Sequence, residues 1–367
     1  MLRSFALSGL LLLALVTQGC DAGSRSADSQ APVVDPSSLE IGDDTDLGSG
    51  DEGFGPTPVA LHGALHVTGT ELRDEHDKRF QLRGVSSMWL NWEDDGYAEN
   101  LEGLKWLRNN WHVNLIRASM GVEANGGYFD NPEKAKAQVV QIVENAITAG
   151  VYVLIDWHTE QAHKQTVESA AFFGEMASKY AGVPNVLFET FNEPTWKEGK
   201  DTTMLTWPDL KPYHQAVIAA IRAADPAHES VVVLGTPNWS QYVDQAALDP
   251  VAGKNLMYTL HFYACEHGTG LISRGQSAMD KGLALFVTEW GATNADGGVN
   301  GEVCPQKAQT WMDFMNPRGI SWAAWKFDDC KDSTCFLAAG APLTGGWTSE
   351  FLHGEGLFLR ARLQEQP

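Results

Sequence analysis

Basic residues are scarce in this sequence. The chain of 367 residues has 26 Lys and Arg against 47 Asp and Glu, which gives a formal net charge of −21. Its Lys and Arg form no cluster. Phosphate groups are bound by clustered basic side chains, so this composition argues against nucleic acid and other polyanionic partners. The excess of acidic residues favours a neutral or cationic ligand.

Long hydrophobic runs are also lacking. The apolar run "FALSGLLLLALV" at residues 5–16 follows Arg3, ends at "TQGC", and is too short for a stable membrane-spanning helix. This pattern is typical of an export signal. Because it ends at Cys20, it is similar to a bacterial lipoprotein signal, in which that Cys becomes the lipid-modified first residue. We expect residues 1–20 to be a signal peptide of an exported protein whose membrane contact is a lipid anchor on Cys20. Secretion after ordinary cleavage is the alternative.

Cysteine is rare, with five residues in the chain and no Cys-x-x-Cys pair. Setting Cys20 aside leaves four, which in an exported protein suggests two disulfides. Cys330 and Cys335 are close enough to close a short loop, which leaves Cys265 with Cys304. A zinc site is the competing interpretation, and the missing Cys-x-x-Cys spacing argues against it. We expect no metal and no organic cofactor.

Residues 21–55 are poor in aromatics and hold nine acidic residues and one basic residue, Arg25. Such a segment cannot bury enough apolar surface to fold, so residues 21–58 are interpreted as a flexible acidic linker. The remaining residues, 59–364, are expected to form a single domain without internal repeats. Two short alternating segments within residues 64–84 predict a β-hairpin at its start.

The chain does have a regular alternation of apolar, β-branched runs with amphipathic helical stretches. The runs lie at residues 80–84, 113–117, 151–157, 185–190, 230–235, 256–262, 283–289 and 320–325. In one helical stretch, Asn131 can cap the first turn, Pro132 suits the first helical position, and Gly150 ends the helix. Eight apolar strands alternating with helices indicate a (β/α)8 TIM barrel of the α/β class. An open doubly wound sheet is the alternative, but its Gly-rich phosphate loop is missing.

Polar and aromatic side chains follow these runs. In a (β/α)8 barrel the active site forms at the carboxyl ends of the strands. We expect those ends to carry, in chain order, Arg83, Ser86, Ser87 and Trp92; Asn114 and Arg117; Asp156 and His158; Asn192 and Glu193; His261 and Tyr263; Glu289; and Trp325. So many charged, imidazole, phenol and indole groups at strand ends indicate one shared site.

Two of these residues, Glu193 and Glu289, suit acid and base chemistry. They follow the fourth and seventh strands, from which their side chains could come within the roughly 5–5.5 Å needed for retaining hydrolysis of a glycosidic bond. One carboxyl group must be protonated and the other ionised, so their surroundings must separate their pKa values. The thirteen Trp residues also favour a sugar ligand, although core packing accounts for about half of them.

Nine stretches carry a resemblance to a known family: "RGVSSMWLNW", "NLIRASM", "YVLIDWH", "PNVLFETFNEP", "KPYHQAVIAAIRAADP", "LGTPNWSQ", "MYTLHFYA", "FVTEWG" and "ISWAAW". Over about residues 60–360, the chain resembles glycoside hydrolase family 5 of clan A, and within it the bacterial endoglucanases, or cellulases. The resemblance implies a retaining endo-β-1,4-glucanase that hydrolyses internal bonds of a β-glucan by double displacement, with residues 59–364 as its catalytic domain.

The resemblance also implies a role for each site residue. Glu193 would be the general acid/base and Glu289 the nucleophile, and Arg117 would keep Glu289 ionised. Asn192 would hydrogen-bond the sugar 2-hydroxyl, and Tyr263 would donate a hydrogen bond to Glu289. His158 and His261 would surround the cleaved sugar, and Trp325 would lie beneath it. The remaining substrate contacts would be Trp92 and Trp239, which stack on neighbouring sugars, and Lys331.

The chain departs from the family pattern at two places. Related endoglucanases read "RGMSSHGL", whereas Met88 and Trp89 replace the His and the Gly here, so that Trp89 could add a stacking face or narrow the cleft. The loop after Trp325 has one extra residue, which displaces Lys331 from the position of the family's lysine. Mannan, xylan and mixed-linkage glucan are alternative substrates. The alternative class is a carbohydrate-binding lipoprotein without turnover, which would lack one of the two glutamates. We expect a monomer.

Overall fold

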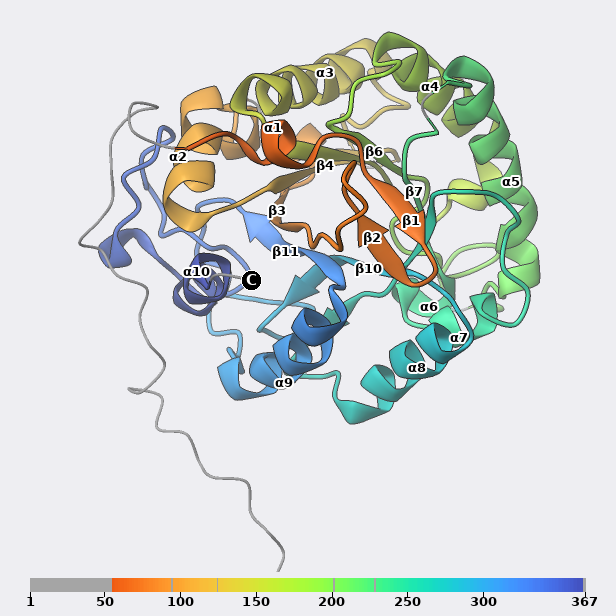
Figure 1. The fold of residues 1–367 in the computed structure, drawn as a ribbon. Helices are drawn as coiled ribbons and strands as arrows, with labels where there is room; N and C mark the ends of the chain where they lie inside the picture. Colours follow the sequence, from red (N-terminus) through yellow and green to blue (C-terminus); the bar gives the residue numbers. More distant parts are fainter. Residues whose placement is uncertain (1–54, 94, 124, 201, 228, 366–367) are drawn as a thin grey trace, which may run out of the picture. The chain divides into compact units, whose positions relative to one another are not determined.

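A closed ring of parallel strands surrounded by helices forms the centre of the fold (Figure 1). The computed structural model describes residues 55–365 except 94, 124, 201 and 228. The strands are β1 His66–Thr68, β2 Glu71–Arg73, β3 Arg83–Ser87, β4 Leu115–Gly121, β5 Tyr152–His158, β6 Val186–Glu189, β7 Val232–Leu234, β8 Leu256–Thr259, β9 Phe262–Tyr263, β10 Leu285–Gly291 and β11 Ser321–Phe327.

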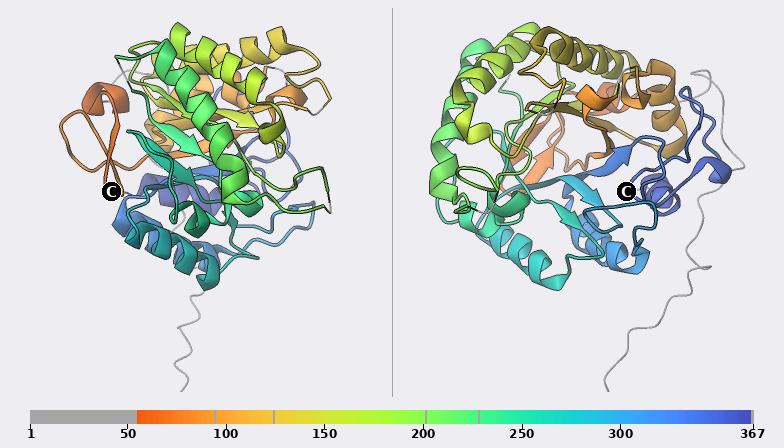
Figure 2. Two further views of the ribbon diagram at one scale, coloured as in Figure 1. Left: turned by 90° about the vertical axis from the view of Figure 1, so that its right-hand side faces the viewer. Right: turned by 180° about the vertical axis from the view of Figure 1, so that it is seen from behind.

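Helices lie between successive strands and cover the outside of the ring, as the two views of Figure 2 also show. The α-helices are α1 Pro58–His62, α2 Leu101–Trp111, α3 Pro132–Ala149, α4 Thr166–Lys179, α5 Trp207–Ala224, α6 Pro237–Ser240, α7 Val243–Ala246, α8 Thr269–Asp280, α9 Pro305–Met315 and α10 Gly356–Gln364. Single 3₁₀ turns lie at Leu90–Trp92, Tyr97–Glu99, Ala162–Lys164, Asn316–Arg318 and Ser349–Phe351. Within the described residues, no helix combines the length and apolar character needed to cross a membrane.

The strand order confirms the predicted (β/α)8 barrel and excludes the open doubly wound sheet. The order is β11–β3–β4–β5–β6–β7–β8–β10, and β10 pairs with β11 to close the ring. The short β9 pairs with β10 beyond the end of β8. All these pairs are parallel. The carboxyl ends of all eight barrel strands therefore meet at one mouth.

Helix α3 shows how closely local signals define an element. Asn131 accepts a hydrogen bond from Lys134 N, Pro132 is the first helical residue, and Gly150 ends the helix in the left-handed region with φ 69°. These are the positions that the sequence predicts. The predicted β-hairpin is also present, because β1 and β2 pair antiparallel from His66–Arg73 to Thr68–Glu71.

The hairpin lies across the amino-terminal end of the barrel, the end that faces the viewer in Figure 1. Leu65 and Leu72 pack there against an apolar cluster made by the first inward-facing residues of the strands, among them Leu115, Leu187 and Phe286. The hydroxyl of Tyr152 donates to Gly63 O at 2.7 Å. The barrel interior is thus filled with apolar side chains at its amino-terminal end.

Two predicted strand-end residues lie at the wrong end. Arg83 is the first residue of β3, and Asn114 precedes the first residue of β4. At this amino-terminal end, the backbone N–H of Arg83 donates to the side-chain Oδ1 of Asn114 at 2.6 Å. β3 begins at Arg83 and β4 at Leu115, whereas the apolar runs begin at residues 80 and 113. An apolar residue that leads into a strand cannot be distinguished by its type from one within it. The predicted signal peptide, Cys20 and most of the acidic linker lie outside the described residues.

Candidate active site

A cavity of about 580 Å³ lies at the carboxyl ends of the strands. A cavity of this size suits a ligand of several rings. Eight of the predicted site residues line it, which are His158, Asn192, Glu193, Trp239, His261, Tyr263, Glu289 and Trp325. The prediction of one shared site at the barrel mouth therefore agrees with the geometry.

The two glutamates face each other across this cavity. A carboxylate oxygen of Glu193, one of Glu289 and a ring nitrogen of His261 all lie within 4.8 Å of one another. Glu289 is carried by β10, whose pairing with β11 shifts register between Val287 and Trp290. Such an irregularity re-aims side chains next to active sites. Here Trp290 packs in the outer core, while Glu289 reaches the cavity.

Arg117 connects Glu289 to the barrel interior. Its guanidinium is fully buried and lies 3.0 Å from Glu289 Oε2, 2.7 Å from Glu189 Oε2 and 2.9 Å from Asp156 Oδ2. Burial alone would lower the pKa of Arg117, but the three carboxylates raise it. Burial raises the pKa of both Asp156 and Glu189 to about 7, against the attraction of Arg117. The cation compensates for the burial of the acids, which unpaired would be very costly.

Asn192 and Tyr263 orient the groups next to Glu289. Asn192 Oδ1 accepts from Arg117 Nη2 at 2.6 Å. Its NH₂ group lies 3.5 Å from His158 Nε2, which uses one of its two hydrogens and leaves the other for a ligand. The hydroxyl of Tyr263 donates to Glu289 Oε1 at 2.7 Å. Burial, followed by the charge of Glu289, raises the pKa of Tyr263 well above its usual value, so it stays a donor. Glu289 therefore has a cation on one oxygen and a hydroxyl donor on the other.

The surroundings of Glu193 have the opposite electrostatic character. Burial, and then the negative charge of Glu160, raise the pKa of Glu193 to about 8. Its Oε1 lies 2.9 Å from Nδ1 of His261. Burial lowers the pKa of His261 to about 4, so this imidazole is neutral near pH 7. Glu193 is thus protonated at neutral pH, whereas the partners of Glu289 are a buried cation and a hydroxyl donor.

Aromatic side chains form one side of the cavity. The rings of Trp325 and His158 are stacked, with centroids 5.4 Å apart. Trp89, which stands where the related endoglucanases have Gly, lines the cavity, and its ring stacks on Trp92 at 4.8 Å. Trp92 itself is 57% exposed at the edge. The departure from the family pattern therefore places an additional indole in the site.

Trp239 also lines the cavity. Asn238, Trp239 and Ser240 have φ values of 58°, 53° and 55°, a region that residues other than glycine rarely adopt. Two hydrogen bonds hold this turn, from Ser240 Oγ to Asn192 O at 2.7 Å and from Trp239 N to Pro194 O at 3.1 Å. Backbone strain of this kind is common at functional sites.

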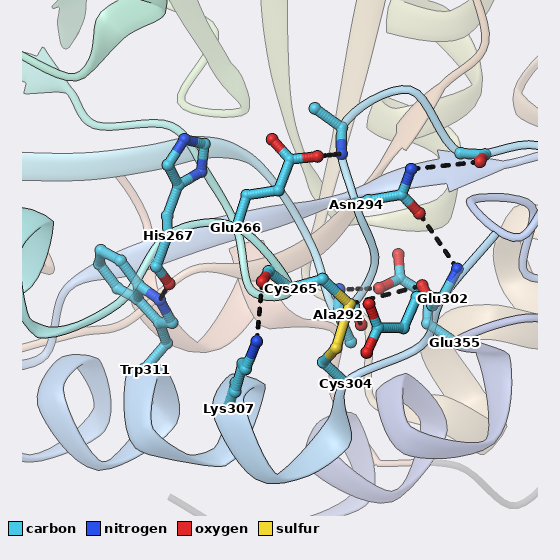
Figure 3. Close-up of a disulfide and its surroundings, with 12 residues drawn as sticks. Cys265, Glu266, His267, Ala292, Asn294, Glu302, Cys304, Lys307, Trp311 and Glu355 are labelled. Atoms are coloured by element: carbon cyan, nitrogen blue, oxygen red, sulfur yellow. Dashed lines mark hydrogen bonds between the residues drawn. A yellow bond between two sulfur atoms is a disulfide. The ribbon is translucent and has the colours of Figure 1, made fainter.

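Both predicted disulfides are present, Cys265–Cys304 and Cys330–Cys335. Their sulfurs are bonded to each other, so the zinc interpretation is wrong. Figure 3 shows Cys265–Cys304 joining the loop after β9 to the start of α9, beside Ala292, whose N–H donates to the buried carboxylate of Glu355. Lys307 Nζ donates to Cys265 O at 2.8 Å. The bridge therefore ties together the segments that follow Tyr263 and Glu289.

Lys331 is exposed, and it lies outside the set of described residues that line the cavity. Sequence reasoning missed other residues, namely Glu189 beneath the site, Thr288 next to Glu289, and Glu160, Asn238, Gln241, Glu266, His267 and Asp296 in the cavity wall. Glu189 had a signal, since it is a charged residue inside the apolar run of β6. The loop residues had none, because their approach depends on the closed barrel.

One group of possible metal ligands lies in the site, formed by Glu193, His261 and Glu289. Both ring nitrogens of His261 have protein hydrogen-bond partners, and both oxygens of Glu289 do as well. The atoms that would bind a metal are therefore already paired in a way that suits proton transfer. A barrel with two carboxyl groups facing one cavity in contrasting surroundings, beside stacked aromatic rings, defines the class of a glycoside hydrolase.

Comparison with known proteins agrees with this class. The model of the family "Cellulase (glycosyl hydrolase family 5)" matches residues 73–331. Endoglucanase N of Pectobacterium atrosepticum is 40% identical over 312 residues, which cover 84% of this chain and 67% of that protein. An endoglucanase of Clostridium saccharobutylicum is 40% identical over 310 residues, covering 82% of this chain and 65% of the relative. The chain thus spans about two thirds of the length of these relatives.

Solved structures show the same fold. The catalytic domain of Thermobifida fusca endoglucanase Cel5A has a TM-score of 0.77 at 32% identity, covering 84% of this chain and 100% of that one. A structure from Cytophaga hutchinsonii has a TM-score of 0.78 at 37% identity, covering 84% of this chain and 97% of the other. The chain belongs to glycosyl hydrolase family 5.

Proposed function

We propose that the protein is a retaining endo-β-1,4-glucanase that hydrolyses internal bonds of a β-glucan. The observation that carries this proposal is the approach of Glu193 and Glu289 to within 4.8 Å across one cavity. That separation leaves room for one anomeric carbon between the two groups, but not for the water molecule that an inverting enzyme places there. The family relatives named endoglucanase support the choice of a β-1,4-glucan.

In the first step, ionised Glu289 attacks the anomeric carbon and forms a glycosyl-enzyme ester. Glu193 gives its proton to the departing glycosidic oxygen. In the second step, the Glu193 carboxylate takes a proton from water, which attacks the anomeric carbon and releases Glu289. The NH₂ group of Asn192 is oriented to donate to the sugar 2-hydroxyl, and the ring of Trp325 is the floor under that sugar.

The test is release of reducing ends from carboxymethyl cellulose, mixed-linkage β-glucan, mannan and xylan, with Glu289→Gln as the inactive control. We expect the highest rate on a β-1,4-glucan. A higher rate on mannan or xylan would contradict the proposed glucan substrate and leave the proposed mechanism unchanged. No release from any of the four polymers would favour a carbohydrate-binding protein without turnover.

We also propose that the protein is exported, acts as a monomer, and is held at the cell envelope by a lipid on Cys20. The support is the short apolar run that ends at this cysteine in the sequence. Cell fractionation of the full chain and of Cys20→Ala tests the anchor. Equal recovery of both in the membrane fraction would contradict it.

A further inference from the structure

A line of hydrogen bonds runs from Glu193 back into the barrel wall. His261 Nδ1 lies 2.9 Å from Glu193 Oε1, and His261 Nε2 lies 2.8 Å from Thr288 Oγ1. Thr288 Oγ1 in turn lies 2.5 Å from Glu189 Oε1. His261, Thr288 and Glu189 are each buried to 1% exposure or less. Water is therefore largely excluded from the inner part of this line, and its protons must be shared among the four side chains.

The direction of these hydrogen bonds follows from Glu189. Its other oxygen, Oε2, accepts from Arg117 Nε at 2.7 Å. Burial raises the pKa of Glu189 to about 7 and Arg117 opposes this rise, so the carboxylate is ionised above about pH 7. An ionised carboxylate only accepts hydrogen bonds. The single hydroxyl proton of Thr288 must then be donated to Glu189, so that Thr288 can only accept from His261.

The same reasoning decides the tautomer of His261. A neutral imidazole carries one N–H. Because Thr288 needs a donor, that proton is on Nε2, and Nδ1 is an acceptor. The partner of Nδ1 is Glu193 Oε1, so the proton between them must belong to the carboxyl group.

We propose that Thr288 and Glu189 are positioning residues that hold His261 in its Nε2–H tautomer, so that Nδ1 accepts a hydrogen bond from protonated Glu193. This deepens the proposed function, since it rests on the acid role of Glu193. Once Glu193 has given its proton to the leaving oxygen, its carboxylate faces a bare ring nitrogen and gains no hydrogen bond from it. The ionised form is therefore disfavoured, and Glu193 readily takes a proton back from the attacking water.

Other groups also act on Glu193, and they come from most of the elements around it. The ionisable groups that face it are His261, Glu160, Glu189, Asp156, Glu289, Tyr263 and Arg117. The carboxylates disfavour a further negative charge, and Arg117 opposes them. His261 differs from the rest because it makes the direct hydrogen bond, so its tautomer can be changed while those charges stay in place.

The test is Thr288→Val, with Thr288→Ser as the matched control that keeps the hydroxyl. In Thr288→Val the Nε2–H would be buried without a partner, because Glu189 Oε1 is 3.9 Å away. His261 would change to the Nδ1–H tautomer and donate to ionised Glu193. We expect the alkaline limb of kcat/KM to move down by about one pH unit, with rates falling most for substrates with poor leaving groups.

Thr288→Ser should keep the alkaline limb of the native enzyme. A Thr288→Val enzyme whose limb coincides with that of the native enzyme would overturn the proposal, as would an equal shift in both variants. If Thr288→Val does not fold, a second measurement still tests the tautomer of His261, because it needs no substitution at Thr288.

That measurement is ¹⁵N NMR of the full protein with labelled histidine at pH 7.5, between the pKa of Glu189, about 7, and that of Glu193, about 8. The His261 signals are identified by their loss in His261→Gln. We expect a protonated Nε2 and a bare Nδ1. A protonated Nδ1 would overturn the proposal. No turnover is needed, so an enzyme that hydrolyses no glucan would refute the proposed function and still leave the tautomer decidable.

Discussion

The two ends of the barrel interior are built on the same strands and have opposite chemistry. On β4 the inward-facing residue Leu115 is followed two positions later by Arg117, and on β6 Leu187 is followed by Glu189. The amino-terminal end is an apolar cluster closed by the β1–β2 hairpin. At the carboxyl end, the buried cation Arg117 has three carboxylates around it.

Because of this difference, we expect the amino-terminal end to contribute mainly to the stability of the fold and the carboxyl end mainly to catalysis. Burial of apolar side chains contributes roughly 25 cal/mol for each Å² removed from water, so the amino-terminal end stabilises the fold. Buried charges contribute little net stability even when they are paired. At the carboxyl end, burial and the charges nearby instead raise the pKa of Glu193. We therefore expect substitutions at the two ends to affect different measurements.

The largest expected effect is the loss of rate in Glu193→Gln. Removing a general acid should lower kcat/KM on glucan by about 10²–10⁴-fold, and much less on aryl glycosides whose leaving groups need no proton. The native rate should fall as pH rises through the pKa of Glu193, which lies near 8, because only the protonated form is an acid. The variant should lose this alkaline limb, and pH profiles on both kinds of substrate check it.

The matched control is Glu168→Gln, at an exposed position on α4. It should keep the native rate and pH profile. If Glu193→Gln lost rate equally on substrates with good and with poor leaving groups, the acid role of Glu193 would be contradicted. The proposed functional difference between the two ends of the barrel would then lack support.

The complementary substitution is Leu72→Ala in the hairpin. Leu72 is 1% exposed and belongs to the amino-terminal cluster. Its truncation should lower the free energy of unfolding by about 2–5 kcal/mol, measured by urea denaturation, and leave kcat/KM unchanged at low temperature. Leu61→Ala, at a position 48% exposed in α1, should have a much smaller effect. A loss of rate without a loss of stability in Leu72→Ala would show that the two ends are coupled.

The sequence predicts features that depend on local pattern or on short spacing. The eight strands, α3 with its caps, and the two disulfides follow from residue types and are confirmed. Glu193 and Glu289 also come from strand-end position and family resemblance. Arg83 and Asn114 were assigned to the wrong end because an apolar run does not mark where pairing begins.

The line of side chains behind Glu193 could not be predicted in this way. Glu189, Thr288 and His261 come from separate strands or strand ends, and they meet only once the ring has closed. The register shift in β10 between Val287 and Trp290, which includes Glu289, has no signature in the sequence. Long-range contacts of this kind depend on barrel geometry, which residue types alone do not encode.

The central claim is that Glu289 becomes covalently bonded to the sugar while Glu193 does not. The most direct measurement is treatment of the native enzyme with an activated 2-deoxy-2-fluoro cellobioside, followed by intact mass and peptide mass spectrometry. We predict one added glycosyl group per chain, in the peptide that contains Glu289, and no label in Glu289→Gln. A label on Glu193, or turnover of the reagent without any trapped ester, would contradict the account.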